Sequence, residues 1–212
     1  MKPIHEVSAV FALVMLVIWS GEIISLPVWP LALLALFLLL NYWRNNPDLF
    51  KNLWNSNTGV SYYYVLIWFS FLIFWRSITL TGEIWNPHLW YQPDFIENFS
   101  ISLAFYLPNA LWQQVLVNGY FLPRLEEGFQ NEKKAILALG LLFGLVHIPN
   151  PVLMPITMVG GMASAYFFKR TKNIYVLIVA HSILAVSAMY FLPEAWHHHL
   201  MIGPGYFKNW AP

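Results

Sequence analysis

Apolar residues occur along the chain in runs that show no polar face. Residues 29–40, for example, are all apolar apart from one proline. A helix that is apolar on every side lies inside protein or inside a bilayer, and a span takes about 20 such residues, or fewer where other protein caps it. The pattern predicts about seven helical spans, near residues 6–25, 28–43, 61–80, 101–121, 134–148, 152–168 and 174–192. Because the second, fifth and sixth are short, one or two of them are candidates for half-spans or a re-entrant hairpin.

The composition argues against a soluble protein. The chain has 212 residues, of which 58% are hydrophobic and 10% charged, and its mean hydropathy is +0.55. A soluble domain carries roughly a quarter of its residues as Asp, Glu, Lys or Arg. So few charged side chains cannot cover a soluble surface. The chain is therefore predicted to be an all-α protein, a polytopic membrane helix bundle that has the lipid bilayer as its main partner.

Charge and cysteine content exclude further classes of protein. The formal net charge is +1 and the basic residues sit between apolar runs, so no basic patch predicts a nucleic-acid partner. The chain contains no cysteine. This excludes disulfides, thiolate catalysis and cysteine-bound metal.

The N-terminus resembles a signal peptide, because Lys2 precedes the apolar run 7–19. However, no small-x-small cleavage site follows and Glu22 interrupts the end of the run, so we expect a retained first span. Basic residues gather in cytoplasmic loops. With the N-terminus in the cytoplasm, the outer loop 81–99 contains no Lys or Arg, and the inner segments hold Lys2, Arg44, Lys51, Arg124, Lys133, Lys134, Lys169, Arg170 and Lys172. This segregation predicts a cytoplasmic N-terminus, and we expect a multi-pass protein of the bacterial inner membrane.

No internal repeat, low-complexity tract or linker divides the chain. We therefore expect one membrane domain over residues 1–212.

A few polar side chains interrupt the predicted spans, and each needs a reason because polar groups are costly in a bilayer. Glu22 and Arg76 lie near outer helix ends, where they can pair or reach the headgroups. The others lie deeper: at 1.5 Å per residue, Gln114 is about 15 Å from the inner end of its helix. Since three helices place polar groups near mid-membrane, we expect a shared polar cavity formed by Gln113, Gln114, Asn118, His147 and His181.

Two other groups of residues have simpler interpretations. The small residues Gly160, Gly161 and Ser164 predict close helix packing. The run His197, His198 and His199 suggests a metal site, but adjacent residues on a helix point in different directions. We therefore expect no bound metal and no cofactor.

At these positions the chain resembles the CPBP family (CAAX protease and bacteriocin-processing, also called Abi) of intramembrane endopeptidases, with a core at about residues 101–192. The first family motif, E-E-x-x-x-R, corresponds to Gln113, Gln114 and Asn118, and is followed by a family-like stretch at 119–125. The F-x-x-x-H motif appears as Phe143 to His147, and the H-x-x-x-N motif begins at His181 and ends at Ala185.

The resemblance implies a catalytic site at Gln113, Gln114, Asn118, His147 and His181. In the family, a glutamate of the first motif activates water, histidines assist, and an asparagine helps to stabilise the oxyanion. This sequence departs from that pattern, because a glutamine has no basicity with which to replace a glutamate. Three amides stand where the motif has two acids and an arginine, which removes every formal charge from that helix face. The changes look coordinated and favour natural divergence.

Three hypotheses follow. The first is an endopeptidase that processes a prenylated or other membrane-embedded peptide, with His147 or His181 as the general base. The second is a proteolytically inactive relative that binds a membrane peptide, lipid or partner protein in the same cavity. The third, weaker hypothesis is a different enzyme or a small transporter with a lipid-like substrate.

Overall fold

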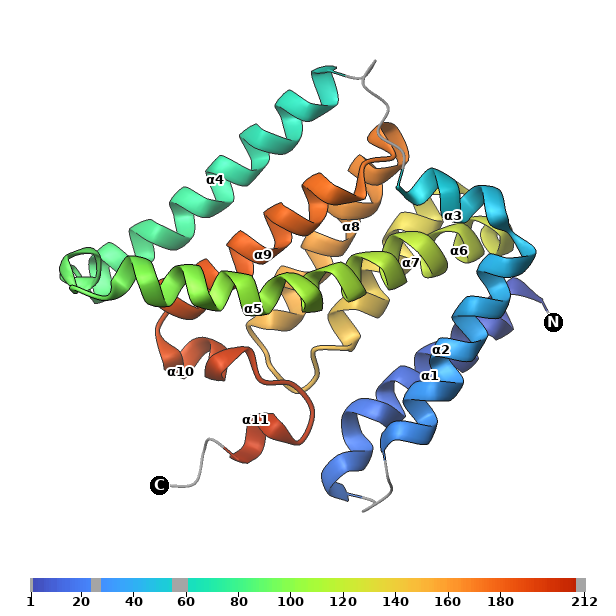
Figure 1. The fold of residues 1–212 in the computed structure, drawn as a ribbon, viewed down its shortest axis with the longest axis horizontal. Helices are drawn as coiled ribbons and strands as arrows, with labels where there is room; N and C mark the ends of the chain where they lie inside the picture. Colours follow the sequence, from blue (N-terminus) through green and yellow to red (C-terminus); the bar gives the residue numbers. More distant parts are fainter. Residues whose placement is uncertain (1, 24–27, 55–60, 209–212) are drawn as a thin grey trace.

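The computed structural model describes residues 2–23, 28–54 and 61–208, and this described part is helical without strands. Within each of these ranges, turns and short loops join the helices (Figure 1). The elements are α1 (Pro3–Ile23), α2 (Val28–Asn45), α3 (Pro47–Leu53), α4 (Ser61–Trp85), η1 (Leu89–Tyr91), α5 (Phe95–Leu116), η2 (Val117–Phe121), α6 (Leu122–Phe129), α7 (Glu132–Leu145), α8 (Leu153–Thr171), α9 (Ile174–Phe191), α10 (Glu194–His197), η3 (His198–Leu200) and α11 (Gly205–Lys208).

A helix occupies each of the predicted spans, which confirms the all-helical fold. Within the described residues, three helices are long and apolar enough to cross a membrane, namely Pro3–Ser20, Tyr62–Trp85 and Ile174–Phe191. Some of the other helices are too short to do so alone. The 14 residues of α7 rise about 21 Å, less than the hydrocarbon thickness of about 30 Å. The count of about seven spans therefore stays a prediction.

The helices form two groups (Figure 1). In one group, α7 packs on α8, while α9 packs on both α4 and α5. In the other, α1 and α2 form a hairpin beside α6. One nearly continuous helical segment, α5–η2–α6, runs from the α4 end of the molecule to the hairpin and so links the two groups.

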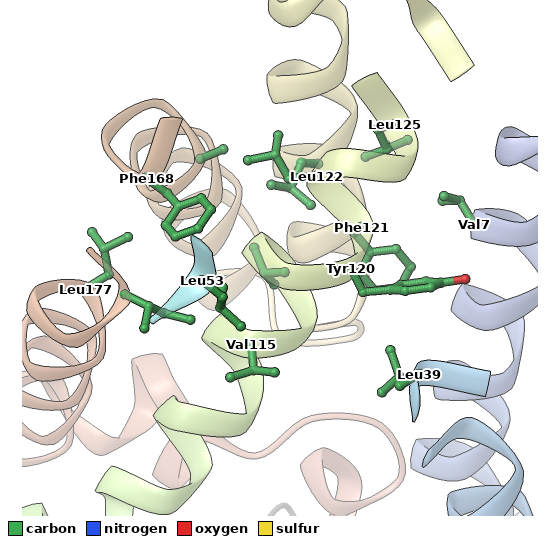
Figure 2. Close-up of a cluster of buried hydrophobic side chains, with 14 of the residues drawn as sticks. Val7, Leu39, Leu53, Val115, Tyr120, Phe121, Leu122, Leu125, Phe168 and Leu177 are labelled. Atoms are coloured by element: carbon green, nitrogen blue, oxygen red, sulfur yellow. The ribbon is translucent and has the colours of Figure 1, made fainter. Parts of the chain in front are cut away.

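The middle of that segment is the π-helical turn η2, and all five of its residues are buried. The turn forms part of the main apolar core (Figure 2). Val7 of α1 and Leu39 of α2 lie on one side of it, and Phe168 of α8 and Leu177 of α9 lie on the other. Such wide turns often accompany functional sites. Here the turn begins shortly after Gln113 and Gln114 and includes Asn118.

Glycines allow the close contact between α7 and α8. A Cβ atom on Gly140 would lie 2.7 Å from the backbone oxygen of Met158 and would also meet the side chain of Met162. The predicted packing role is thus confirmed for Gly161, whose Cβ position lies 3.1 Å from Phe143. It is wrong for Gly160, which has open space around it.

This difference gives a matched pair of variants. Gly140→Ala should lower the free energy of unfolding by about 1–3 kcal/mol, because the backbone oxygen cannot move without separating the helices. Gly160→Ala should cause no loss, because its methyl group meets no atom and alanine favours the helix. Thermal unfolding in detergent measures both. Equal midpoints for the two variants would contradict the packing shown here.

Candidate functional site

A buried network of neutral side chains joins three helices near the middle of the molecule. Gln114 Oε1 accepts hydrogen bonds from Asn118 Nδ2 at 2.7 Å and from Ser164 Oγ at 2.8 Å. Ser164 Oγ in turn accepts one from Asn118 Nδ2 at 2.9 Å. Gln114 Nε2 lies 3.2 Å from His181 Nδ1. Because the amide nitrogen donates, His181 Nδ1 accepts in this arrangement and the ring carries its proton on Nε2.

His147 has a different environment from His181. Its Nδ1 lies 2.7 Å from the backbone oxygen of Phe143, one helical turn earlier. A carbonyl only accepts, so Nδ1 carries the proton and Nε2 holds the lone pair. The Phe143 ring contacts both imidazoles, with centroids 5.1 Å from His147 and 6.1 Å from His181. Phe143 therefore joins the two histidine sites without a hydrogen bond between them.

A cavity of about 390 Å³ lies beside the network, between α1, α5 and α7. Its polar wall consists of Asn109, Gln113 and His147, and most of the rest is apolar. The adjacent residues Gln113 and Gln114 thus have different surroundings. Gln113 lines the cavity, whereas Gln114 is buried in the network at 4% exposure. The Tyr106 hydroxyl interacts with both Asn109 and Gln113 on the same side of α5.

The structure thus brings the five predicted residues into two neighbouring places. Gln114, Asn118 and His181 share the network, and Gln113 and His147 line the cavity. Sequence reasoning assigned Ser164 to helix packing, but its hydroxyl is part of the network. Asn109 was also missed. Its spacing of four residues from Gln113 on a helix was the available signal.

Three carboxylates of α6 and α7 lie outside the site and in ion pairs. Glu126 pairs with Lys169 at 2.6 Å, Glu127 with Arg124 at 2.5 Å, and Glu132 with Arg170 at 2.6 Å. Among the described residues, no Asp or Glu lines the cavity. The described part of the chain also contains no group of three or more His, Cys, Asp or Glu side chains that could hold a metal ion.

An ion pair fixes α1 to the end of the α5–η2–α6 segment. Both Tyr120, at 3.1 Å, and Arg124 donate hydrogen bonds to the Glu6 carboxylate. The Arg124 guanidinium also lies over the Tyr42 ring of α2, 5.0 Å from its centroid. Val10 and Ile18 of α1 line the cavity beyond this contact. Glu6 therefore helps to set the position of one cavity wall.

Glu6→Ala should lower the free energy of unfolding by about 2 kcal/mol, because it leaves two partly buried donors without their acceptor. A suitable control is Glu83→Ala. Glu83 pairs with Arg76 at 2.8 Å, but both side chains are exposed, at 40% and 54%. Such pairs contribute about 0–1 kcal/mol. Chemical denaturation in detergent compares the two variants, and an equal loss would contradict the role given to Glu6.

The same pair shows where Arg76 lies. Arg76 was expected to pair with Glu22 or to reach the headgroups; its guanidinium pairs with Glu83, two turns along α4, and its side chain is 54% exposed. The Glu22 side chain lies outside the described part of the chain.

The histidines at 197–199 have different partners, although the ring centroids of His197 and His199 also lie 6.2 Å apart. The His198 ring centroid lies 4.5 Å from that of Tyr206. His197 is buried at 1% and its Nε2 lies 3.1 Å from the backbone oxygen of Leu192. His199 pairs with Glu194 at 2.6 Å. Asn150, three residues before α8, donates to the His197 backbone oxygen at 3.0 Å. These contacts attach the C-terminal segment to the loop that follows His147.

A smaller cavity, of about 80 Å³, lies on the other side of Asn118. Its wall includes Asn118, Glu126, Lys169 and Lys172. Burial lowers the pKa of Lys172, and the positive charge of Lys169 adds to the effect. The family motif has an arginine at the position of Asn118, and this cavity leaves room for a longer side chain.

The part of the chain that contains the site resembles a known protein family. Residues 95–187 match the family model described as Type II CAAX prenyl endopeptidase Rce1-like. This confirms the resemblance to the CPBP family. The Rce1-like segment runs from the start of α5 into α9 and contains all five predicted site residues. A search of curated proteins and a search of solved structures gave no match.

The Rce1-like family is an integral membrane protease family, and three described helices of this chain are long and apolar enough to cross a membrane. α1, α2 and α4 lie outside the matched residues. One wall of the larger cavity, formed by α1, is therefore not part of the Rce1-like segment.

Proposed function

We propose that the protein takes a membrane-embedded lipid or lipid-modified peptide into the cavity on a CAAX-endopeptidase-like scaffold, and holds it without cleaving it. One observation carries this proposal: Gln114 stands at a glutamate position of the first motif, and its amide oxygen already accepts two hydrogen bonds. Its amide nitrogen is bonded to His181. No basic group is left there to accept a proton from water.

The expected location is the bacterial inner membrane, with the N-terminus in the cytoplasm.

The network also explains how the site remains stable without charge. Exchanging the two acids and the arginine of the motif for amides avoids buried ions and keeps most hydrogen-bonding groups paired. An isolated change from glutamate to glutamine would have left the arginine without a partner. A site that keeps its shape but loses its base is suited to binding.

A second candidate is an endopeptidase that uses His147. The observation in its favour is the His147 Nε2 lone pair, which has no hydrogen-bond partner in the described residues and belongs to a side chain lining the cavity. A neutral imidazole can serve as a general base for an attacking water. The cavity would then hold both the ligand and the base.

The test is to incubate the purified chain in lipid nanodiscs with a prenylated membrane peptide and to follow its mass. We expect the peptide to be recovered intact and to be retained through its prenyl chain, which enters the cavity of the native chain. Retention should fall at least tenfold in Val14→Trp, which fills the cavity. Specific fragments that disappear with His147→Ala would overturn the proposal in favour of the second candidate. Equal retention of the intact peptide by the native chain and by Val14→Trp would contradict binding in the cavity.

A further inference from the structure

The cavity wall carries no charged side chain among the described residues. Asn109, Gln113 and His147 supply its polar groups, together with the indole of Trp112. Moving an ion into an apolar site without a partner of opposite charge costs several kcal/mol. The Glu6–Arg124 pair lies close by, but these side chains bond to each other and do not line the cavity. Carboxylate, phosphate and ammonium headgroups are therefore poor occupants.

His147 determines the kind of polar group that can bind. Its Nδ1 is used within its own helix, so the accessible ring nitrogen, Nε2, offers a lone pair. A lone pair needs a hydrogen-bond donor. An occupant with an uncharged O–H group satisfies it, whereas an ether or ester oxygen does not.

The size of the cavity sets how much of an apolar chain it can enclose. A volume of about 390 Å³ holds about a dozen groups of roughly 30 Å³, the share of one water molecule in the liquid. This corresponds to one chain of about 12 carbons. A peptide segment would bring a backbone donor and an acceptor with every residue, and the few polar side chains could not pair with them all. A single-chain lipid brings one polar group.

From these observations we infer that the cavity binds a single-chain lipid with an uncharged hydroxyl head, whose O–H group donates to His147 Nε2. Its chain lies against Val14 and Ile18 of α1 and Leu142 of α7. This inference rests on the proposed function and specifies its ligand. Because α1 lies outside the Rce1-like segment, part of this specificity belongs to the chain's own N-terminal helix.

The experiment uses the full chain in lipid nanodiscs and a dodecanol probe with a photoreactive diazirine in its chain. Crosslinked residues are located by mass spectrometry. Four competitors are compared by the mole percentage that halves crosslinking: dodecanol, dodecanoate, dodecyl methyl ether and a prenylated peptide. We expect saturable crosslinks to cavity residues of α1, α5 and α7. Dodecanol should compete at least about tenfold better than the other three, the ratio that corresponds to one hydrogen bond of about 1.4 kcal/mol.

Two variants test the role of His147. In His147→Phe, dodecanol and its methyl ether should halve crosslinking at the same mole percentage. The matched change His88→Phe, at an exposed position of the outer loop, should leave the tenfold ratio unchanged. The ratio between dodecanol and its methyl ether is first measured on the native chain. That measurement tests the inference even where His147→Phe fails to fold.

Equal competition by dodecanol, dodecanoate and the methyl ether, with crosslinks still in the cavity, would overturn the inference but leave binding without cleavage intact. Stronger competition by the prenylated peptide would also overturn it and make the peptide the occupant. Crosslinks that do not saturate, or that lie outside the cavity, would contradict this site for the lipid. Cleavage of the prenylated peptide by the native chain is a separate result, and it bears on the proposed function alone.

Discussion

Gln114→Leu is expected to lower the free energy of unfolding by about 2–3 kcal/mol, whereas the same change at the neighbouring Gln113 should shift it by less than about 1 kcal/mol. Gln114 takes part in hydrogen bonds with Asn118, Ser164 and His181. Hydrogen bonds inside membrane proteins average about 0.6 kcal/mol and reach about 1.7 kcal/mol, and unpaired partners add to the loss. A leucine at this position would leave three buried polar groups without their shared partner.

Gln113 makes the matched control because it differs from Gln114 in environment and not in chemistry. Its Oε1 atom is buried without a hydrogen-bond partner, and its side chain lines the apolar cavity. Leucine there removes an unpaired polar oxygen, and the Tyr106 hydroxyl that contacts Gln113 keeps its contact with Asn109, so little stability is lost. Unfolding of both variants in the same detergent, followed by denaturant titration, gives the difference directly. Equal losses would show that the network contributes nothing specific.

The sequence was sufficient to predict the helices and to pick out the polar residues that lie near one another in the candidate site. Apolar runs without a polar face mark membrane helices whatever their neighbours, so helices occur where the pattern predicts them. The polar residues were recognisable because a bilayer admits few of them without a function. The motif order then gave the resemblance that the Rce1-like match confirms.

The arrangement of the site could not be predicted, because it depends on contacts between distant parts of the chain. From the sequence, Ser164 was assigned to helix packing. The structure shows that its Oγ also accepts a hydrogen bond from Asn118 Nδ2 at 2.9 Å. A regular helix places Gln113 and Gln114 on different sides, but only the structure shows that one faces a cavity. The cavity itself needs α1, and nothing in the sequence pairs Glu6 with Arg124 across more than a hundred residues.

The neutral network makes a second large effect predictable. The triple variant Gln113→Glu, Gln114→Glu and Asn118→Arg restores the first family motif. The carboxylate introduced by Gln114→Glu would supply the missing base next to His181, and the guanidinium introduced by Asn118→Arg would supply the opposite charge. The 80 Å³ cavity beside Asn118 leaves space for the longer side chain, and an acidic side chain on its wall offsets part of the charge of the two lysines there. A positioned general base contributes about 10²–10⁴-fold to a rate.

The single variant Gln114→Glu is the control for charge alone. It places a carboxylate in the network without the arginine, and so should lower stability without producing activity. A gain of cleavage that needs all three changes would show that the amides replaced a catalytic unit.

The most direct test of the account is therefore the cleavage of a prenylated membrane peptide by the native chain and by the triple variant, side by side in nanodiscs, with the new termini identified by mass spectrometry. The account predicts no specific cleavage by the native chain and a rise of about a hundredfold or more over background in the triple variant. Specific cleavage by the native chain, with a rate that the triple variant does not increase, would contradict it.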